Sequence, residues 1–84
     1  MVNRRSHLSS AFGAVIRRLR VSAGISQEEL AARAGLHRTY VSILERGKKS
    51  ATLDVVAALA EVLGKAPHAL VRAAERRAAV LGRE

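Results

Sequence analysis

The chain has 84 residues, which is enough for one domain with a modest hydrophobic core. It is too short for two domains, one that recognises a ligand and a second that acts as an effector. Although 49% of the residues are hydrophobic, Phe12 and Tyr40 are the only aromatic ones, so the core must be aliphatic, as in a small helical bundle. The formal net charge of +8 favours a polyanionic partner, nucleic acid or an anionic membrane, over a basic surface that is merely solvated.

The excess positive charge lies in the first half of the chain. Residues 1–50 contain ten Lys and Arg against three acidic residues, whereas residues 51–84 contain five against four. No cysteine is present, which excludes disulfides and thiolate chemistry. The longest apolar run, residues 55–60, falls far short of the ~20 residues of a membrane-spanning helix, and residues 1–10 lack the apolar core of a signal peptide. We therefore expect a soluble cytoplasmic protein, associated with the nucleoid and not with a membrane.

Residues 1–8 are predicted to be a basic N-terminal arm ahead of a single domain over residues 9–81 and a tail over 82–84. Arg4 and Arg5 can lie along a phosphate backbone or enter a minor groove, although a disordered start is the simpler interpretation. A first helix is predicted from Ser9 or Ser10 to about Ser22. Its inner face is expected to consist of Leu8, Phe12, Val15, Ile16 and Leu19.

Residues 26–47 are predicted to form two short helices joined by a tight turn. Ser26 is a suitable N-cap for the first of them, and Glu29, three residues on, can complete a capping box. Gly35 suits the left-handed residue that ends a helix. The second helix is expected to run from after Leu36 to about Arg46, with Gly47 as its stop. Two helices around a short Gly-containing turn are typical of the helix-turn-helix arrangement.

The second of these helices has two distinct faces. Val41 and Leu44 can point inward beside the ring of Tyr40. The opposite face is one continuous stripe at helical spacing, formed by Arg38, Thr39, Ser42, Ile43 and Arg46. Such a stripe suits a DNA major groove, where arginine pairs with guanine, hydroxyls adapt to several base edges and an aliphatic group meets the thymine methyl.

Several residues around this stripe are predicted to contact DNA phosphates. Lys48 and Lys49 form a basic turn after the second helix. His37 is expected to cap that helix or to touch a phosphate. The predicted phosphate contacts here are His37, Tyr40, Arg46, Lys48 and Lys49. On the inner side, Arg20 lies at the edge of the first helix's apolar face, where it can pair with Glu45 and fix one helix against another.

Two further helices are predicted after the basic turn. The first opens at Thr52, with Leu53, Val56, Leu59, Ala60 and Leu63 as its inner face, and closes at Gly64. The second begins at Pro67 and ends near Leu81. Its seam of Leu70, Ala74, Ala78 and Leu81 is predicted to be a dimer interface; the alternative is a frayed, solvated C-terminus.

No arrangement of residues indicates catalysis. His7, His37 and His68 are about thirty residues apart, with no cysteine and few acids near them, so neither a metal site nor a cofactor site is expected. The serines lie outside a nucleophile-elbow context, and no paired carboxylates suggest acid–base chemistry. We expect a protein that is not an enzyme.

Four runs of residues resemble the lambda-repressor-like family of helix-turn-helix proteins, also called the Cro/cI or XRE family. They are SQEELA (26–31), AGL (34–36), HRTYVSILERGKKS (37–50) and LDVVAALAEVLG (53–64). The resemblance spans about residues 12–70. It implies an all-α fold, a compact five-helix DNA-binding domain with the helix-turn-helix at helices 2 and 3 and an extended fifth helix. The segment HRTYVSILERG is most similar to the controller proteins of restriction–modification systems.

The resemblance also implies individual roles. Gln27 would clasp a phosphate and support the reading helix, Lys48 would contact the DNA backbone, and Arg20 and Glu45 would form an internal ion pair. The base-reading positions would be Arg38, Thr39, Ser42 and Ile43. The family usually binds palindromic double-stranded operators as homodimers, so we expect two copies to place helix 3 in major grooves ~34 Å apart and to block or recruit RNA polymerase. The alternative is an antitoxin-like protein-interaction module that uses the same fold and acts through its fifth helix.

Overall fold

The computed structural model describes residues 4–81, and within that range every regular element is a helix. The five helices are α1 (Arg4–Ser22), α2 (Gln27–Ala34), α3 (Arg38–Glu45), α4 (Leu53–Leu63) and α5 (Pro67–Leu81). The predicted all-α, five-helix fold is therefore confirmed. The predicted tail and residues 1–3 lie outside the described part of the chain. None of the described helices is long and apolar enough to cross a membrane.

The helix starts follow from local side-chain chemistry. Ser26 precedes α2, and its hydroxyl oxygen accepts a hydrogen bond from the backbone N–H of Glu29 at 3.0 Å. Thr52 does the same for α4, accepting from the N–H of Val55 at 3.2 Å. The capping box predicted at α2 is only half formed, because the Glu29 carboxylate pairs with Arg33 one turn further on.

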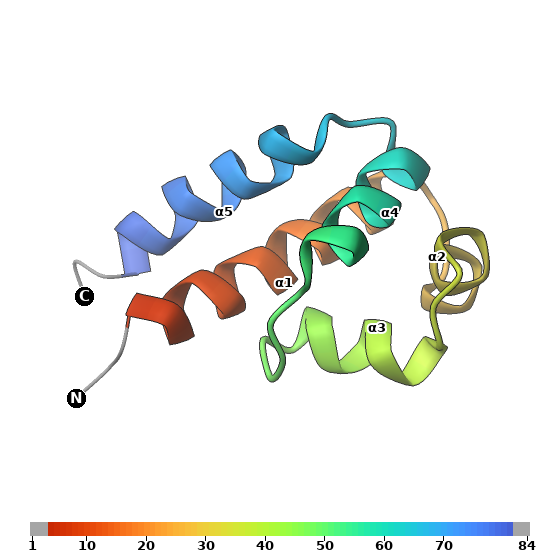
Figure 1. Cartoon of the computed structure of the whole chain (residues 1–84), viewed down its shortest axis with the longest axis horizontal. Helices are drawn as coiled ribbons and strands as arrows, with labels where there is room; N and C mark the ends of the chain where they lie inside the picture. Colours follow the sequence, from red (N-terminus) through yellow and green to blue (C-terminus); the bar gives the residue numbers. More distant parts are fainter. Residues whose placement is uncertain (1–3, 82–84) are drawn as a thin grey trace.

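α1 is the helix around which the others are arranged (Figure 1). α5 runs antiparallel beside it, so that the first turn of α1 and the last turn of α5 lie at the same end, and this pair makes the most extensive contact between any two helices. α3 packs against α1 and α2, and α2 packs in turn against α4. The outer face of α3 is thereby left at the edge of the molecule, at the bottom of Figure 1.

The core is aliphatic, as the composition requires. Its fully buried large side chains come from all five helices: Ile16, Leu30, Val41, Leu44, Leu59 and Leu70. Phe12 is buried with them, whereas Tyr40 only packs against the edge of the cluster. The inner faces predicted for helices 1 and 3 are confirmed at Phe12, Val15 and Ile16 and at Val41 and Leu44.

Three predictions about the helix ends were wrong. α1 begins at Arg4 and not at Ser9 or Ser10 as predicted, so residues 4–8 of the predicted arm belong to this helix. Leu8 and Leu53, both predicted to face inward, are exposed, Leu53 by 85%. Leu53 is the first residue of α4, and the packing that covers Val56 one turn later does not reach it. Helical spacing therefore identified the correct face of each helix. It did not show where along the helix that face stops being covered by neighbouring helices.

The seam predicted for dimerisation is also differently placed. Leu70 and Ala74 are buried in the core and Ala78 is partly buried against it, while the side chain of Leu81 lies outside the described residues. The cause is the length of α1. At 1.5 Å per residue, its 19 residues extend ~28 Å and so cover the ~22 Å of the 15-residue α5. Leu70 and Ala74 therefore pack within the monomer and are not available to bind a second copy.

A close backbone approach joins α1 to α3 at Gly13. A Cβ atom at this position would lie 2.1 Å from the carbonyl oxygen of Leu44 and 3.0 Å from that of Glu45. We expect Gly13→Ala to lower the free energy of unfolding by about 2 kcal/mol, although the same change inside an unobstructed helix stabilises by about 0.5–1 kcal/mol. Thermal unfolding should show a melting temperature lower by about 10 °C.

Gly24→Ala is the matched control for this variant. No atom lies within 4 Å of the added Cβ there, so only the left-handed backbone, with φ of +73°, opposes the change. Its expected cost is about 1 kcal/mol. A Gly13→Ala protein as stable as the unmodified chain would show that α1 and α3 do not approach this closely.

Candidate nucleic-acid interface

α2 and α3 form a helix-turn-helix, and the turn between them is fixed by backbone conformation. Gly35 ends α2 with φ of +70°, a left-handed conformation that side chains with a Cβ rarely adopt. The next N–H, that of Leu36, donates to the carbonyl of Ala31 at 2.8 Å and so satisfies an otherwise open end of α2. The chain then enters α3 through His37 in an extended conformation.

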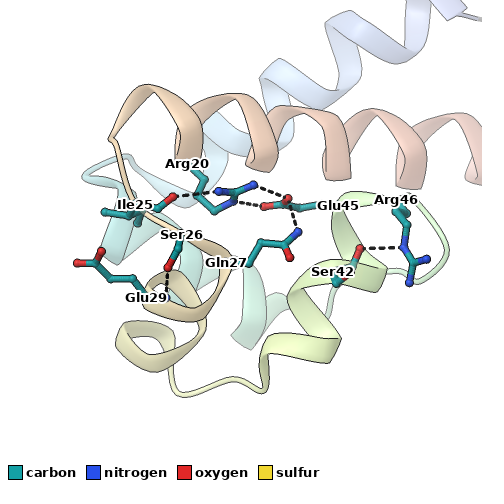
Figure 2. Close-up of polar contacts among 8 residues, drawn as sticks. All are labelled: Arg20, Ile25, Ser26, Gln27, Glu29, Ser42, Glu45 and Arg46. Atoms are coloured by element: carbon teal, nitrogen blue, oxygen red, sulfur yellow. Dashed lines mark hydrogen bonds and ion pairs between the residues drawn. The ribbon is translucent and has the colours of Figure 1, made fainter.

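A buried polar network holds the far end of α3. The Arg20 guanidinium donates from Nε and Nη2 to the two carboxylate oxygens of Glu45, at 2.7 and 3.1 Å. Its Nη1 donates to the carbonyl of Ile25 at 2.9 Å, and the amide nitrogen of Gln27 donates to Glu45 at 3.0 Å. Figure 2 shows these groups converging from α1, from the loop before α2, from the start of α2 and from the end of α3.

The network is satisfied as well as buried. The side chain of Glu45 is only 3% exposed and that of Arg20 only 13%. Among the described residues, no buried side-chain nitrogen or oxygen lacks a hydrogen-bond partner. The hydrogen bonds with Glu45 raise the pKa of Arg20 above its ordinary value, outweighing the opposing effect of burial, so Arg20 is always charged. The two residues that the sequence pairs thus meet in a bidentate contact, which fixes direction as well as distance.

The outer face of α3 carries the predicted base-reading residues. Arg38 and Thr39, at its start, are exposed, and Ser42 and Ile43, one turn later, are half-buried. Arg46 follows the helix, is exposed, and donates from Nε to the carbonyl of Ser42 at 3.4 Å. Helical spacing puts Arg38, Thr39, Ser42 and Ile43 on the side of α3 away from the buried Val41 and Leu44. The face combines a guanidinium with hydroxyl and methyl groups that a groove can contact.

The predicted phosphate contacts lie around this face in different environments. His37, Lys48 and Lys49 are exposed, and His37 caps α3 with its backbone alone. Lys49 Nζ lies 5.5 Å from the centre of the Tyr40 ring, within range of a cation–π contact. Burial raises the pKa of Tyr40, so its phenol stays protonated at neutral pH and is able to donate a hydrogen bond. Gln27 is half-buried, with its amide committed in part to Glu45.

Two features of this region were missed by sequence reasoning. Glu28 lies beside the predicted base reader Arg38, with its Oε1 3.7 Å from Arg38 Nε. Ten residues separate the two in sequence, so no helical spacing links them, and only the turn at Gly35 brings them together. The second feature is an open apolar groove of about 260 Å³ beside the basic turn. Its lining includes Leu8, Phe12, Lys49, Leu53, Val56 and Val71.

Comparison with known proteins agrees with this geometry. The family model described as Helix-turn-helix matches residues 16–70, well over half of the chain. The chain therefore belongs to the helix-turn-helix family, and its class is that of DNA-binding transcriptional regulators.

Individual relatives narrow the class. The chain is 41% identical over 61 residues to Control protein C.BamHI of Bacillus amyloliquefaciens, an alignment that covers 71% of this chain and 75% of that one. The crystal structure of the restriction-modification controller protein C.AhdI from Aeromonas hydrophila superimposes with a TM-score of 0.70 at 41% identity, covering 73% of this chain and 92% of that one. The clp gene regulator ClgR from Corynebacterium glutamicum gives a TM-score of 0.85 at 29% identity, covering 90% and 81%. The predicted similarity to controller proteins is thus confirmed.

The buried network leads to a stability prediction. Glu45→Ala leaves the Arg20 charge buried without its partner, and removing one member of a buried ion pair costs about 3 kcal/mol or more. Urea unfolding should show this loss. Glu29→Ala is the control, because it removes an exposed i,i+4 pair worth about 0.3–0.5 kcal/mol. Equal losses in the two variants would contradict the anchoring role given to Glu45.

Proposed function

We propose that this chain regulates transcription by reading an operator sequence with α3 in the DNA major groove. The observation that carries the proposal is the outer face of α3, where Arg38, Thr39, Ser42 and Ile43 are presented by a helix whose far end is anchored through Glu45. Arginine can pair bidentately with guanine, hydroxyls can accept from or donate to several bases, and the isoleucine can contact a thymine methyl. The anchor fixes the angle at which these groups enter the groove.

Phosphate contacts would set the register of the protein on DNA. Lys48, Lys49 and Arg46 supply positive charge around α3, and His37 and Tyr40 supply ring N–H and O–H groups. An amide has two N–H groups, so Gln27 can hold Glu45 with one while the other donates to a phosphate. Such contacts are blind to sequence and provide much of the affinity.

We further propose that the protein binds DNA as a homodimer, through the apolar groove beside the basic turn. Exposed Leu53 stands on the rim of this groove, so a two-fold axis would let the Leu53 of each copy enter the hollow of the other. We choose a second copy as the occupant because the same surface has both an exposed leucine, Leu53, and an apolar groove into which the leucine of another copy could fit. Lys49 and Ser50 line this groove and also belong to the loop that follows α3. A two-fold axis at the groove would therefore place both α3 helices on the same side of the dimer.

The proposed dimer would act as a controller of gene expression by blocking or recruiting RNA polymerase. No reaction is assigned to it, since its family is regulatory. Because the proposed partner is operator DNA, we place the protein in the cytoplasm at the nucleoid. The rival function, a protein-interaction module acting through the fifth helix, would have to use the outer side of α5, because Leu70 and Ala74 are buried inside the monomer.

Selection of binding sites from random duplex DNA tests the function directly. We expect an inverted repeat that is bound ~10³-fold or more tightly than scrambled DNA. No enriched site, together with affinity that vanishes as salt rises, would contradict sequence-specific reading.

Arg38 and Lys48 separate base reading from phosphate contact. Arg38→Ala should cost about 1–3 kcal/mol on the selected operator and relax discrimination at one base pair, because a bidentate contact is lost. Lys48→Ala should weaken binding to all DNA alike and reduce the slope of log affinity against log salt by roughly one. Titrations of operator and scrambled duplexes at several salt concentrations measure both. Equal losses on specific and scrambled DNA in both variants would remove Arg38 from the base-reading set.

Leu53→Glu tests the proposed dimer surface. Placing a carboxylate in an apolar contact should weaken self-association by at least about tenfold, because each buried leucine contributes about 1.5–3 kcal/mol. Sedimentation equilibrium gives the dissociation constant, and binding to a single half-site should be unaffected. Val21→Glu, at the 59%-exposed end of α1 and outside the groove lining, adds the same charge and should leave the dimer intact. Unchanged association of the Leu53→Glu protein would move the interface elsewhere.

A further inference from the structure

Glu28 and Arg38 form an ion pair across the helix-turn-helix. Glu28 is in the first turn of α2 and Arg38 is the first residue of α3. Their closest atoms, Oε1 and Nε, are 3.7 Å apart, and the side chains are 78% and 63% exposed. This distance is longer than the 2.7–2.9 Å typical of a charge-assisted hydrogen bond, so the contact is loose and electrostatic. It joins an acidic group to the side chain that we propose reads a base.

The geometry of the pair leaves the reading edge of the arginine available. Glu28 lies nearest to Nε, on the side of the guanidinium. The two terminal nitrogens at the other end of the fork can still donate in parallel to the N7 and O6 atoms of guanine. Glu28 can therefore attract the guanidinium without competing for the atoms that would pair with the base.

The charge of Glu28 is unusual for its place. Residues 1–50 contain only three acidic side chains. Glu45 is buried with Arg20 and Gln27, and Glu29 pairs with Arg33 on its own helix. Glu28 alone of the three pairs with a proposed base reader, on a surface that is proposed to face phosphates. An exposed carboxylate there repels DNA, and the repulsion is offset only while Arg38 remains beside it.

We propose that Glu28 is a specificity-determining positioning residue for Arg38. With guanine opposite Arg38, the arginine bridges the base and the carboxylate, and both charges are satisfied. With another base, either Arg38 stays with Glu28 and no base contact forms, or Arg38 moves to a phosphate and leaves Glu28 unpaired near DNA. Both outcomes penalise the wrong sequence, so Glu28 lowers the affinity for other DNA more than the affinity for the operator. This inference rests on the proposed function of Arg38.

Glu28→Gln in the full chain tests the proposal, because it removes the charge while keeping the size of the side chain. Three duplexes are compared: the selected operator, the operator with the guanine opposite Arg38 replaced, and scrambled DNA. We expect affinity for the last two to rise about threefold while affinity for the operator changes little, so discrimination falls about threefold. An unchanged melting temperature confirms that the fold is intact.

Two controls isolate the pair. Glu29→Gln removes a neighbouring carboxylate whose partner is Arg33, and it should change binding to all three duplexes alike. In an Arg38→Ala background, Glu28→Gln should no longer alter discrimination at the guanine, because there is no arginine left to position.

The outcomes separate this inference from the proposed function. An unmodified protein that shows no sequence preference overturns the proposed function and, with it, the role of Glu28. A clear operator preference that Glu28→Gln leaves unchanged, or that Glu29→Gln reduces equally, overturns the role of Glu28 alone. So does an effect of Glu28→Gln on discrimination that persists without Arg38.

Discussion

The contact between Arg20 and Glu45 is the constraint on which the rest of the structure depends. It links the last turn of α1 to the last residue of α3, and Gln27 extends it to the start of α2. A buried ion pair adds little net stability compared with apolar packing, but a bidentate one tolerates few alternative directions. Its contribution here is therefore to orientation, because it fixes the direction of α2 and α3 relative to α1.

Packing of α3 and α5 against α1 leaves the outer side of α3 exposed. Gly13 lets the backbone of α3 come into contact with α1 at one side, and the long α5 covers α1 at another. With Val41 and Leu44 turned into the core, the remaining side of α3 must face outward. Phe12 is the one buried aromatic side chain among the described residues, so the core depends mainly on close backbone approach and on complete burial of medium-sized aliphatic side chains.

The charges on the exposed face serve two purposes in the proposed function. Lysine and arginine around α3 attract any DNA, and this general attraction must be limited if one sequence is to be favoured. As proposed, Glu28 would supply a local limit beside Arg38. Dimerisation through the apolar groove would supply another, because a dimer engages strongly only where two half-sites are correctly spaced. Affinity and discrimination would thus arise from different groups.

The sequence by itself determined the number of helices, the cap at Ser26, the start of the fourth helix at Thr52, the pairing of Arg20 with Glu45 and the stripe on α3. The cap and the stripe depend on local propensities and helical spacing between neighbouring residues. The pairing of Arg20 with Glu45, which are 25 residues apart, follows from the place of Arg20 at the edge of an apolar face and from a recognisable family pattern. Only the tertiary structure decided that Leu53 is exposed, that Leu70 and Ala74 are internal, and that Glu28 meets Arg38. Those facts depend on how far one helix covers another and on the path of the turn between α2 and α3. Helical spacing gives no information about either.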